Sequence, residues 1–172
     1  MAETIGVTRG INTIVIKGYN PTYIVERRVN GVDIYPGKII TNYGESTQNT
    51  VDLCDAGEPA LGVALEHTLN DGLATTRDPL SIDTVYADTS MVRVGLIGSG
   101  MTVVSFLGGQ TTTTTVYGGS NLVVKSSGNL QLPTAVASST TTTLLNDLLG
   151  YVGKSIEYNT GGTLANTIAL VI

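Results

Sequence analysis

The clearest pattern in the chain lies between residues 91 and 107, where apolar positions alternate with other residues. Val92, Val94 and Leu96 recur at every second position, which is the period of a half-buried strand. Ser99-Gly100 supplies a tight turn, so the pattern predicts a hairpin of Met91–Gly98 and Met101–Leu107. We expect the following residues of this segment in the core: Val92, Val94, Leu96, Val103 and Phe106.

Further strands are predicted on both sides of this segment. Asn30-Gly31 tolerates positive φ at both positions, so we expect a hairpin of Tyr23–Val29 with Val32–Tyr35. A second hairpin is predicted for Asn121–Lys125 with Leu130–Leu132, around a Ser-Ser-Gly-Asn turn.

Other segments complete the outline of the chain. Ala60–Glu66 is predicted as a short strand, and residues 67–90 as a long surface excursion. Thr167–Ile172 is an apolar strand that needs neighbours to cover it. The one plausible helix, Thr143–Leu149, is too short to organise the fold.

Composition agrees with a β protein. The chain has 172 residues, of which 21 are glycines. Hydrophobic residues make up 41% of the chain, and charged residues only 13%. β-branched residues favour strands, and glycine serves the many turns that short strands require. The sequence therefore predicts an all-β protein with an extended N-terminal arm and long loops. We divide it into an arm with the first hairpin (residues 1–35) and a second domain (residues 36–172).

Charge narrows the classes of partner. The net charge is −5 and the sequence pI is about 4.6, which disfavours nucleic acid, because binding to phosphates requires basic residues. The adjacent pair Arg27-Arg28 is interpreted as an exposed strand end or a salt-bridge partner. The longest apolar runs fall well short of a membrane span, so we expect no membrane partner. The threonine runs Thr111–Thr115 and Thr140–Thr143 are read as solvated loops or edge strands, or else as fibre-forming or glycosylated tracts.

Candidate chemistry is sparse. His67 is the single histidine, so a site with two histidine ligands is impossible, and we interpret it as a surface residue. Glu66 and Glu157 both end Gly-led strands and are either a carboxylate pair of the kind found in glycosidases or structural strand ends. The sequence therefore predicts no enzyme and no catalytic, cofactor-binding or metal-binding residues.

Two smaller features contain acidic or thiol side chains. Asp52, Asp55 and Glu58 lie close together in sequence and are either a solvated loop or a cation site. Cys54 is the single cysteine, and it is expected as a small buried apolar residue.

A faint repeat links the two halves of the chain. Leu61–Glu66 and Val152–Glu157 share an apolar–Gly–x–small–apolar–Glu pattern, and Pro36–Ile40 is similar to Gly118–Val123. The pattern indicates either two copies of a small β unit packed together or a chance recurrence in a glycine-rich β protein.

The order of these pieces resembles the capsid cement or head-decoration proteins of tailed bacterial and archaeal viruses. The pieces are Leu61–Glu66, Met91–Leu107, Gly118–Leu132, Val152–Glu157 and Thr167–Ile172, and the likeness covers residues 36–172. Two features depart from the pattern, the excursion after Glu66 and the threonine runs.

The resemblance implies that residues 36–172 form a small β-barrel or β-tulip-like sandwich, a barrel-like decoration domain. It also implies a structural virion protein on the outer capsid surface. Such a protein would assemble as a homotrimer, bind the major capsid protein and stabilise the capsid without a cofactor. Residues 1–20 would form an arm that adds a strand to the capsid surface.

Two other functions use the same features. One is another self-assembling subunit, of a tail tube, fibre, pilus or surface layer. The other is a carbohydrate-binding β module, with Tyr117, Tyr151 and Tyr158 as sugar platforms.

Overall fold

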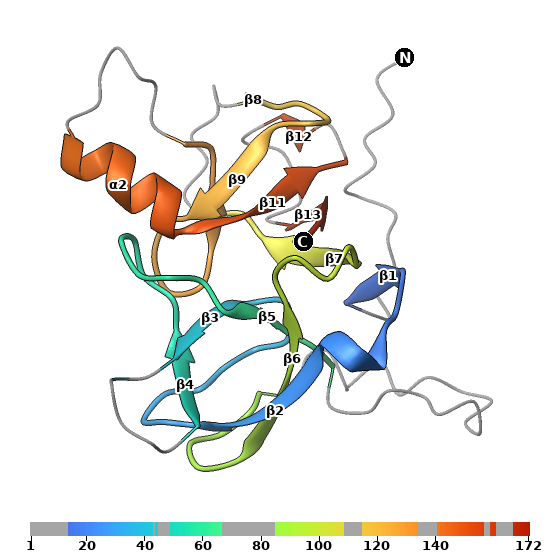
Figure 1. Ribbon diagram of the computed structural model, residues 1–172, viewed down its shortest axis with the longest axis vertical. Helices are drawn as coiled ribbons and strands as arrows, with labels where there is room; N and C mark the ends of the chain where they lie inside the picture. The colour runs from blue at the N-terminus through green and yellow to red at the C-terminus, as the bar shows by residue number, and fades with distance from the viewer. Residues whose placement is uncertain are drawn as a thin grey trace.

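The computed structural model describes residues 14–42, 44, 49–66, 85–108, 115–133, 141–156, 159–160 and 167–172, and the structural statements below refer to these residues. The described chain is all-β with one α-helix and one 3-10 turn (Figure 1). The elements are β1 (Val15–Lys17), η1 (Pro21–Tyr23), β2 (Ile24–Val29), β3 (Ile39–Asn42), β4 (Thr50–Leu53), β5 (Gly62–Ala64), β6 (Met91–Leu96), β7 (Thr102–Phe106), β8 (Thr115–Val116), β9 (Asn121–Val124), β10 (Leu130–Gln131), α2 (Thr141–Leu149), β11 (Tyr151–Ser155), β12 (Asn159–Thr160) and β13 (Thr167–Val171).

The first unit is a closed barrel in the strand order β2-β4-β3-β5-β6. The β2–β4 pair is parallel and the other neighbours are antiparallel. A cluster of buried side chains drawn from all five strands fills it, including Val29, Ile40, Val51, Ala64 and Val94. The expected small β-barrel is thus present, in the lower part of Figure 1.

The second unit is built on a sheet in the order β1-β7-β13-β11-β9-β10. An isolated parallel bridge between Leu107 and Leu130 joins the end of β7 to the start of β10. This bridge curls the sheet toward a second barrel. A short separate pair is formed by β8, which follows β7 in the chain, and β12, which follows β11.

The two units have the same topology. Strands β2, β3, β4, β5 and β6 correspond in chain order and in pairing to β7, β9, β10, β11 and β13. The parallel pair Val29–Val51 of the first unit corresponds to the Leu107–Leu130 bridge of the second. The Ile34–Tyr86 bridge corresponds to the β8–β12 pair.

Backbone details repeat as well. Gly37 has φ of 87° and donates its N–H to the oxygen of Ala64 at 2.7 Å, while Gly119 has φ of 88° and donates to Ser155 at 2.6 Å. Ile40 pairs with Gly62 in the first unit, and Leu122 pairs with Gly153 in the second. The faint sequence repeat is therefore a structural duplication.

The units share a core. In β3, Ile40 points into the first barrel, whereas its neighbour Ile39 belongs to a second buried cluster that also contains Val103, Leu122 and Leu130. Successive side chains of a strand point to opposite faces. Strand β3 is therefore apolar on both faces, because one face fills the barrel and the other covers the second unit.

Two predicted hairpins are wrong. β6 and β7 do not pair with each other, because β2 and β5 occupy both edges of β6 and β7 pairs with β1 and β13. The turn after β6 passes the chain from one unit to the next. β2 likewise pairs with β6 and β4 instead of Val32–Tyr35, and only Ile34 of that segment forms a bridge.

Other predictions are confirmed. β9 and β10 form the expected hairpin, α2 begins two residues before the predicted helix, and β13 lies between β7 and β11. Among the expected core residues, Val92, Val94 and Val103 are fully buried, while Leu96 and Phe106 are half-buried.

The N-terminal arm and the threonine runs are described only in part. Residues 1–13 lie outside the described chain, and β1 pairs with this chain's own β7. The division at residue 36 stays a prediction, although β1 and β2 both pair with strands that follow it. Thr115 lies in β8 and Thr141–Thr143 form the first turn of α2, whereas residues 111–114 and 140 are outside the described part.

Gly62 and Gly153 lead to the first test. A Cβ on Gly62 would overlap the oxygen of Gly95, and one on Gly153 would overlap the oxygen of Val171. Both contacts are with backbone, so the sheet would have to shift, and overpacking of this kind costs about 1–3 kcal/mol. We expect Gly62→Ala and Gly153→Ala each to lower the free energy of unfolding by that amount in urea titrations.

Gly118→Ala is the matched control. A Cβ there would come no closer than 3.7 Å to any neighbour, so the free energy of unfolding should change by less than about 0.5 kcal/mol. If the free energy of unfolding fell equally in all three variants, the close approach of neighbouring strands at Gly62 and Gly153 would be contradicted.

Candidate functional site

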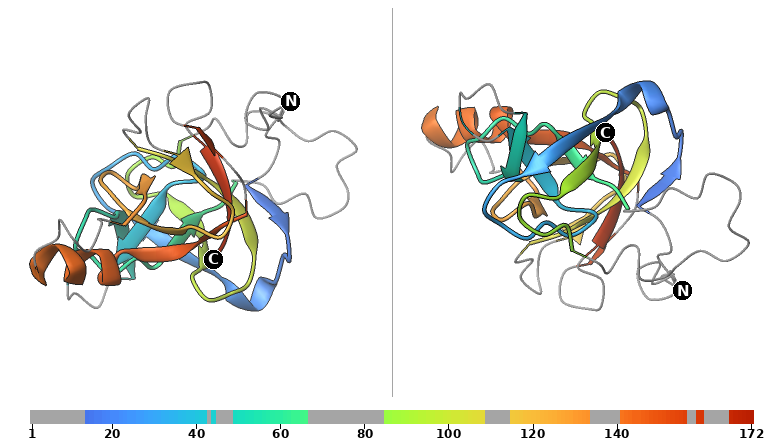
Figure 2. Two further views of the ribbon diagram at one scale, coloured as in Figure 1. Left: turned by 90° about the horizontal axis from the view of Figure 1, so that it is seen from above. Right: turned by 90° about the horizontal axis from the view of Figure 1, so that it is seen from below.

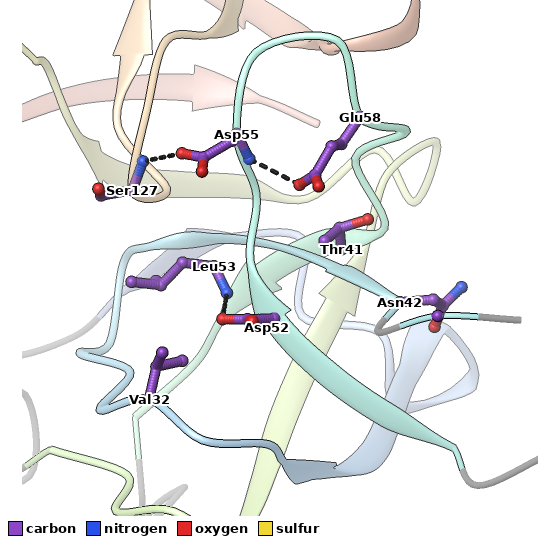
Figure 3. Close-up of a pocket in the computed structure, with 9 residues that line it drawn as sticks. Val32, Thr41, Asn42, Asp52, Leu53, Asp55, Glu58 and Ser127 are labelled. Atoms are coloured by element: carbon purple, nitrogen blue, oxygen red, sulfur yellow. Dashed lines mark hydrogen bonds between the residues drawn. The ribbon is translucent and has the colours of Figure 1, made fainter. Parts of the chain in front are cut away.

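A pocket of about 380 Å³ lies beside the first barrel, where the β4–β5 loop meets the β9–β10 turn (Figure 3). It is lined by residues of both units, namely Val32, Thr41, Asn42, Gly44, Asp52, Leu53, Asp55, Glu58 and Ser127. Three of these residues are the carboxylates that lie close together in the sequence, so the pocket contains the candidate acidic site.

Each of the three carboxylates accepts a backbone N–H. Asp52 accepts from Leu53 at 2.6 Å, Asp55 accepts from Ser127 at 2.6 Å and Glu58 accepts from Asp55 at 2.9 Å. Figure 3 shows that the Asp52 carboxylate lies apart from the other two. No group of three or more His, Cys, Asp or Glu side chains within the described ranges could hold a metal ion. The three carboxylates are thus engaged with the backbone of β4, of the β4–β5 loop and of the β9–β10 turn, and the choice between a solvated loop and a cation site stays a prediction.

Glu66 is a buried strand-end residue, 5% exposed, and accepts the N–H of Ile14 at 3.2 Å. It thereby fastens the segment before β1 to the first barrel. The second glutamate of the proposed pair, Glu157, lies outside the described residues, as do His67 and Tyr158. Their roles stay predictions.

Burial suppresses the reactivity of two other groups. Cys54 is fully buried, as predicted, and its burial, with Glu58 and Asp55 nearby, raises the pKa of the thiol to about 12. Burial also raises the pKa of Tyr86, whose hydroxyl donates to the oxygen of Leu65 at 3.0 Å. Neither group is activated as a nucleophile.

Lys38 sits at the junction of the two units. Its Nζ donates to Asn129 Oδ1 at 2.5 Å and lies 5.1 Å from the centre of the Phe106 ring. Partial burial lowers the pKa of this amine. Its contacts assign Lys38 to holding the β9–β10 turn and β7 against β3.

The large hydrophobic side chains that are exposed include several tyrosines and leucines. Tyr117 is 62% exposed and Tyr151 is 38% exposed, and they belong to different segments, the β8–β9 turn and the start of β11. Within the described residues, four leucines of α2 are also strongly exposed, and they were not predicted as surface residues from the sequence. Their spacing over residues 144–149 was the available signal. No helix in the described part of the chain is long and apolar enough to cross a membrane.

The Asp55–Ser127 contact can be tested by mutation. Asp55→Ala removes the acceptor of the Ser127 N–H and should lower the free energy of unfolding by about 1 kcal/mol, because the contact is exposed. Asp33→Ala, a change at another exposed carboxylate, is the control and should have an effect below about 0.5 kcal/mol. Chemical denaturation measures both, and indistinguishable values would contradict the role of Asp55.

The thiol of Cys54 offers a pH test. With its pKa near 12, the thiolate fraction at pH 8 is roughly one in ten thousand, whereas an unfolded thiol with a pKa of about 8.5 is substantially ionised. We expect a disulfide reagent to leave the folded protein unmodified at pH 8 and to modify it rapidly in denaturant. The folded state should also lose stability as pH rises from about 8.5 toward 12, because ionisation then favours the unfolded chain. Rapid labelling of the folded protein would contradict this assignment.

No protein-family model matches the chain, and no curated protein is significantly similar to it in sequence. Among solved structures, the fold is similar to that of the head fiber gp8.5 N base in bacteriophage phi29. The TM-score is 0.50 and the sequence identity 12%, and the match covers 87% of this chain and 92% of that chain. At this identity the likeness establishes a shared fold, which spans both units.

Proposed function

We propose that this chain is a non-enzymatic structural protein of a tailed-virus particle, which binds the outer surface of the assembled capsid as a decoration protein and stabilises it. The observation that carries the proposal is the fold shared with a phage head fiber base over 87% of the chain. The sequence resemblance to head-decoration proteins points to the same part of a virion.

The described side chains support a structural role. The carboxylates of the pocket and Glu66 accept backbone N–H groups, and the Cys54 thiol is held protonated by burial. A protein that acts by binding alone needs shape and contact area instead of activated groups. Stabilisation of the capsid then follows from mass action, at about 2.7 kcal/mol per site when the free protein is at a hundredfold excess over Kd.

The partners we propose are the major capsid protein and further copies of this chain. A homotrimer around local threefold axes of the capsid would place identical contacts on three neighbouring capsid subunits. A fibre subunit is the second candidate function, favoured by the structural similarity to a phi29 head fiber protein. The two differ in assembly, because decoration requires discrete closed oligomers, whereas a fibre built of this chain requires open head-to-tail contacts.

Binding to undecorated capsids of the same virus tests the proposal. Purified protein should co-sediment with the particles, saturate at a fixed ratio to the capsid protein and raise the temperature at which the particles break. Unassembled capsid protein is the control and should bind much more weakly, because the proposed site spans neighbouring subunits. Absence of saturable binding would contradict the proposed decoration of the capsid. Open polymers of the chain alone in mass photometry would favour a fibre subunit.

A further inference from the structure

Helix α2 (Thr141–Leu149) presents its apolar face to solvent. Leu144, Leu145, Leu148 and Leu149 are 42%, 52%, 72% and 40% exposed, and no residue of the helix is buried. At 100° per residue, the four leucines fall within an arc of about 140° on one side of the helix. The half-buried positions Thr143, Asn146 and Asp147 lie on the opposite side.

The polar side attaches the helix to the body of the protein. The site for a Cβ on Gly57 lies 2.9 Å from Asn146 Oδ1, so the Asn146 side chain rests against the β4–β5 loop. The N–H of Ala60 donates to the oxygen of Leu149 at 3.4 Å, at the end of the helix. This reverses the usual arrangement of a surface helix, in which the apolar stripe faces the core.

The duplication shows that the fold does not need this helix. In the first unit, β4 and β5 are joined by a loop from Cys54 to Leu61, and the barrel is closed. In the second unit, α2 stands in the corresponding connection between β10 and β11. Figures 1 and 2 show it at the periphery of the molecule in all three views. A leucine face that is added to a finished fold and turned outward requires an explanation other than folding.

We propose that the leucine face of α2 is the surface through which copies of this chain associate around a rotation axis. The inference deepens the proposed function, on which it rests for the expectation that the chain acts as an oligomer. Its partner is a second copy of the same chain, with α2 packed against α2.

Charge favours a second copy as the partner. The chain carries a net charge of −5, so identical molecules repel one another overall. The leucine face carries no charge, because the one charged residue of the helix, Asp147, is half-buried on the other side. An uncharged apolar face is complementary to itself, so two acidic copies can pack together there without bringing like charges close to one another.

The width of the face favours more than two copies. In heptad terms the leucines take positions g, a, d and e. A two-helix pair covers mainly a and d and would leave the flanking leucines partly in water. Three helices around an axis also cover the flanking positions, since each helix then has a neighbour on both sides. The same symmetry gives every copy an identical contact.

A paired substitution tests the inference. The double variant Leu145→Lys with Leu148→Lys places two charges on the face, and it should fold normally because neither side chain is buried. In sedimentation velocity over a concentration series, the wild-type chain should form a discrete oligomer, whereas the variant should be monomeric with at least a tenfold weaker association. The matched control, Met91→Lys with Tyr117→Lys, removes apolar side chains that are 53% and 62% exposed elsewhere, and it should associate like the wild type.

Cross-linking gives a second readout that does not depend on affinity. The single native cysteine is buried, so Leu148→Cys introduces an accessible thiol at the centre of the face. Mild oxidation should give covalent dimers, whereas Tyr117→Cys should stay largely monomeric under the same conditions.

The outcomes separate this inference from the proposed function. The α2 contact would be overturned by a monomeric wild-type chain or by an unchanged oligomer in the leucine variant. It would also be overturned if the control variant lost association to the same extent as the leucine variant. A monomeric chain whose leucine variant fails to bind capsids would also overturn it, because the face would then be covered by the capsid. Saturable capsid binding that persists after loss of the oligomer would leave decoration intact.

Discussion

The β9–β10 turn is bonded through its backbone into the first barrel, and the joining of the two units depends on this contact. Gly128 donates its N–H to the oxygen of Cys54, and Ile39 donates its N–H to the oxygen of Gly128, both at 2.9 Å. Only glycine fits, since a Cβ would lie 2.6 Å from the oxygen of Ile39 and φ is +68°. Buried backbone groups left without partners are costly. Neither strand β3 nor the turn could therefore be buried here without the other, and the two units form one fold around a shared core.

The shared core requires strands that are apolar on both faces, because the two duplicated units pack against each other. Both faces of β3 and β5 are buried, one inside the first barrel and one against the second unit, so these strands carry unbroken apolar runs such as Ile39-Ile40 and Val63-Ala64-Leu65. Gly62 and Gly153 allow a neighbouring strand to approach at the same point in each unit. The units differ where the fold permits additions, and α2 is such an addition. Divergence after duplication thus had room to alter connections while the strand pairings stayed the same.

Local chemistry decided which parts of this fold could be predicted from sequence. The β9–β10 hairpin was predictable because residues 126–129 carry the turn and the strands on either side pair with each other. The period-two pattern of residues 91–107 correctly indicated strands, but a period says nothing about the neighbour, and β6 pairs with β2 and β5 from far along the chain. The helix was predictable from its composition. The outward direction of its leucines was not, because it is set by the contact of Asn146 with Gly57, which joins two units.

The acidic groups of the described chain act mainly where strand pairing ends. Glu66 holds the N–H of Ile14, and Asp55 holds the N–H of Ser127, so each carboxylate satisfies a backbone group that has no strand partner at that point. A carboxylate committed in this way is poorly placed to serve as an acid, a base or a metal ligand. Recognition is then left to the exposed apolar side chains, and their largest cluster lies on the one described helix. This arrangement suits the proposed role of a protein that binds a capsid surface and associates with its own copies.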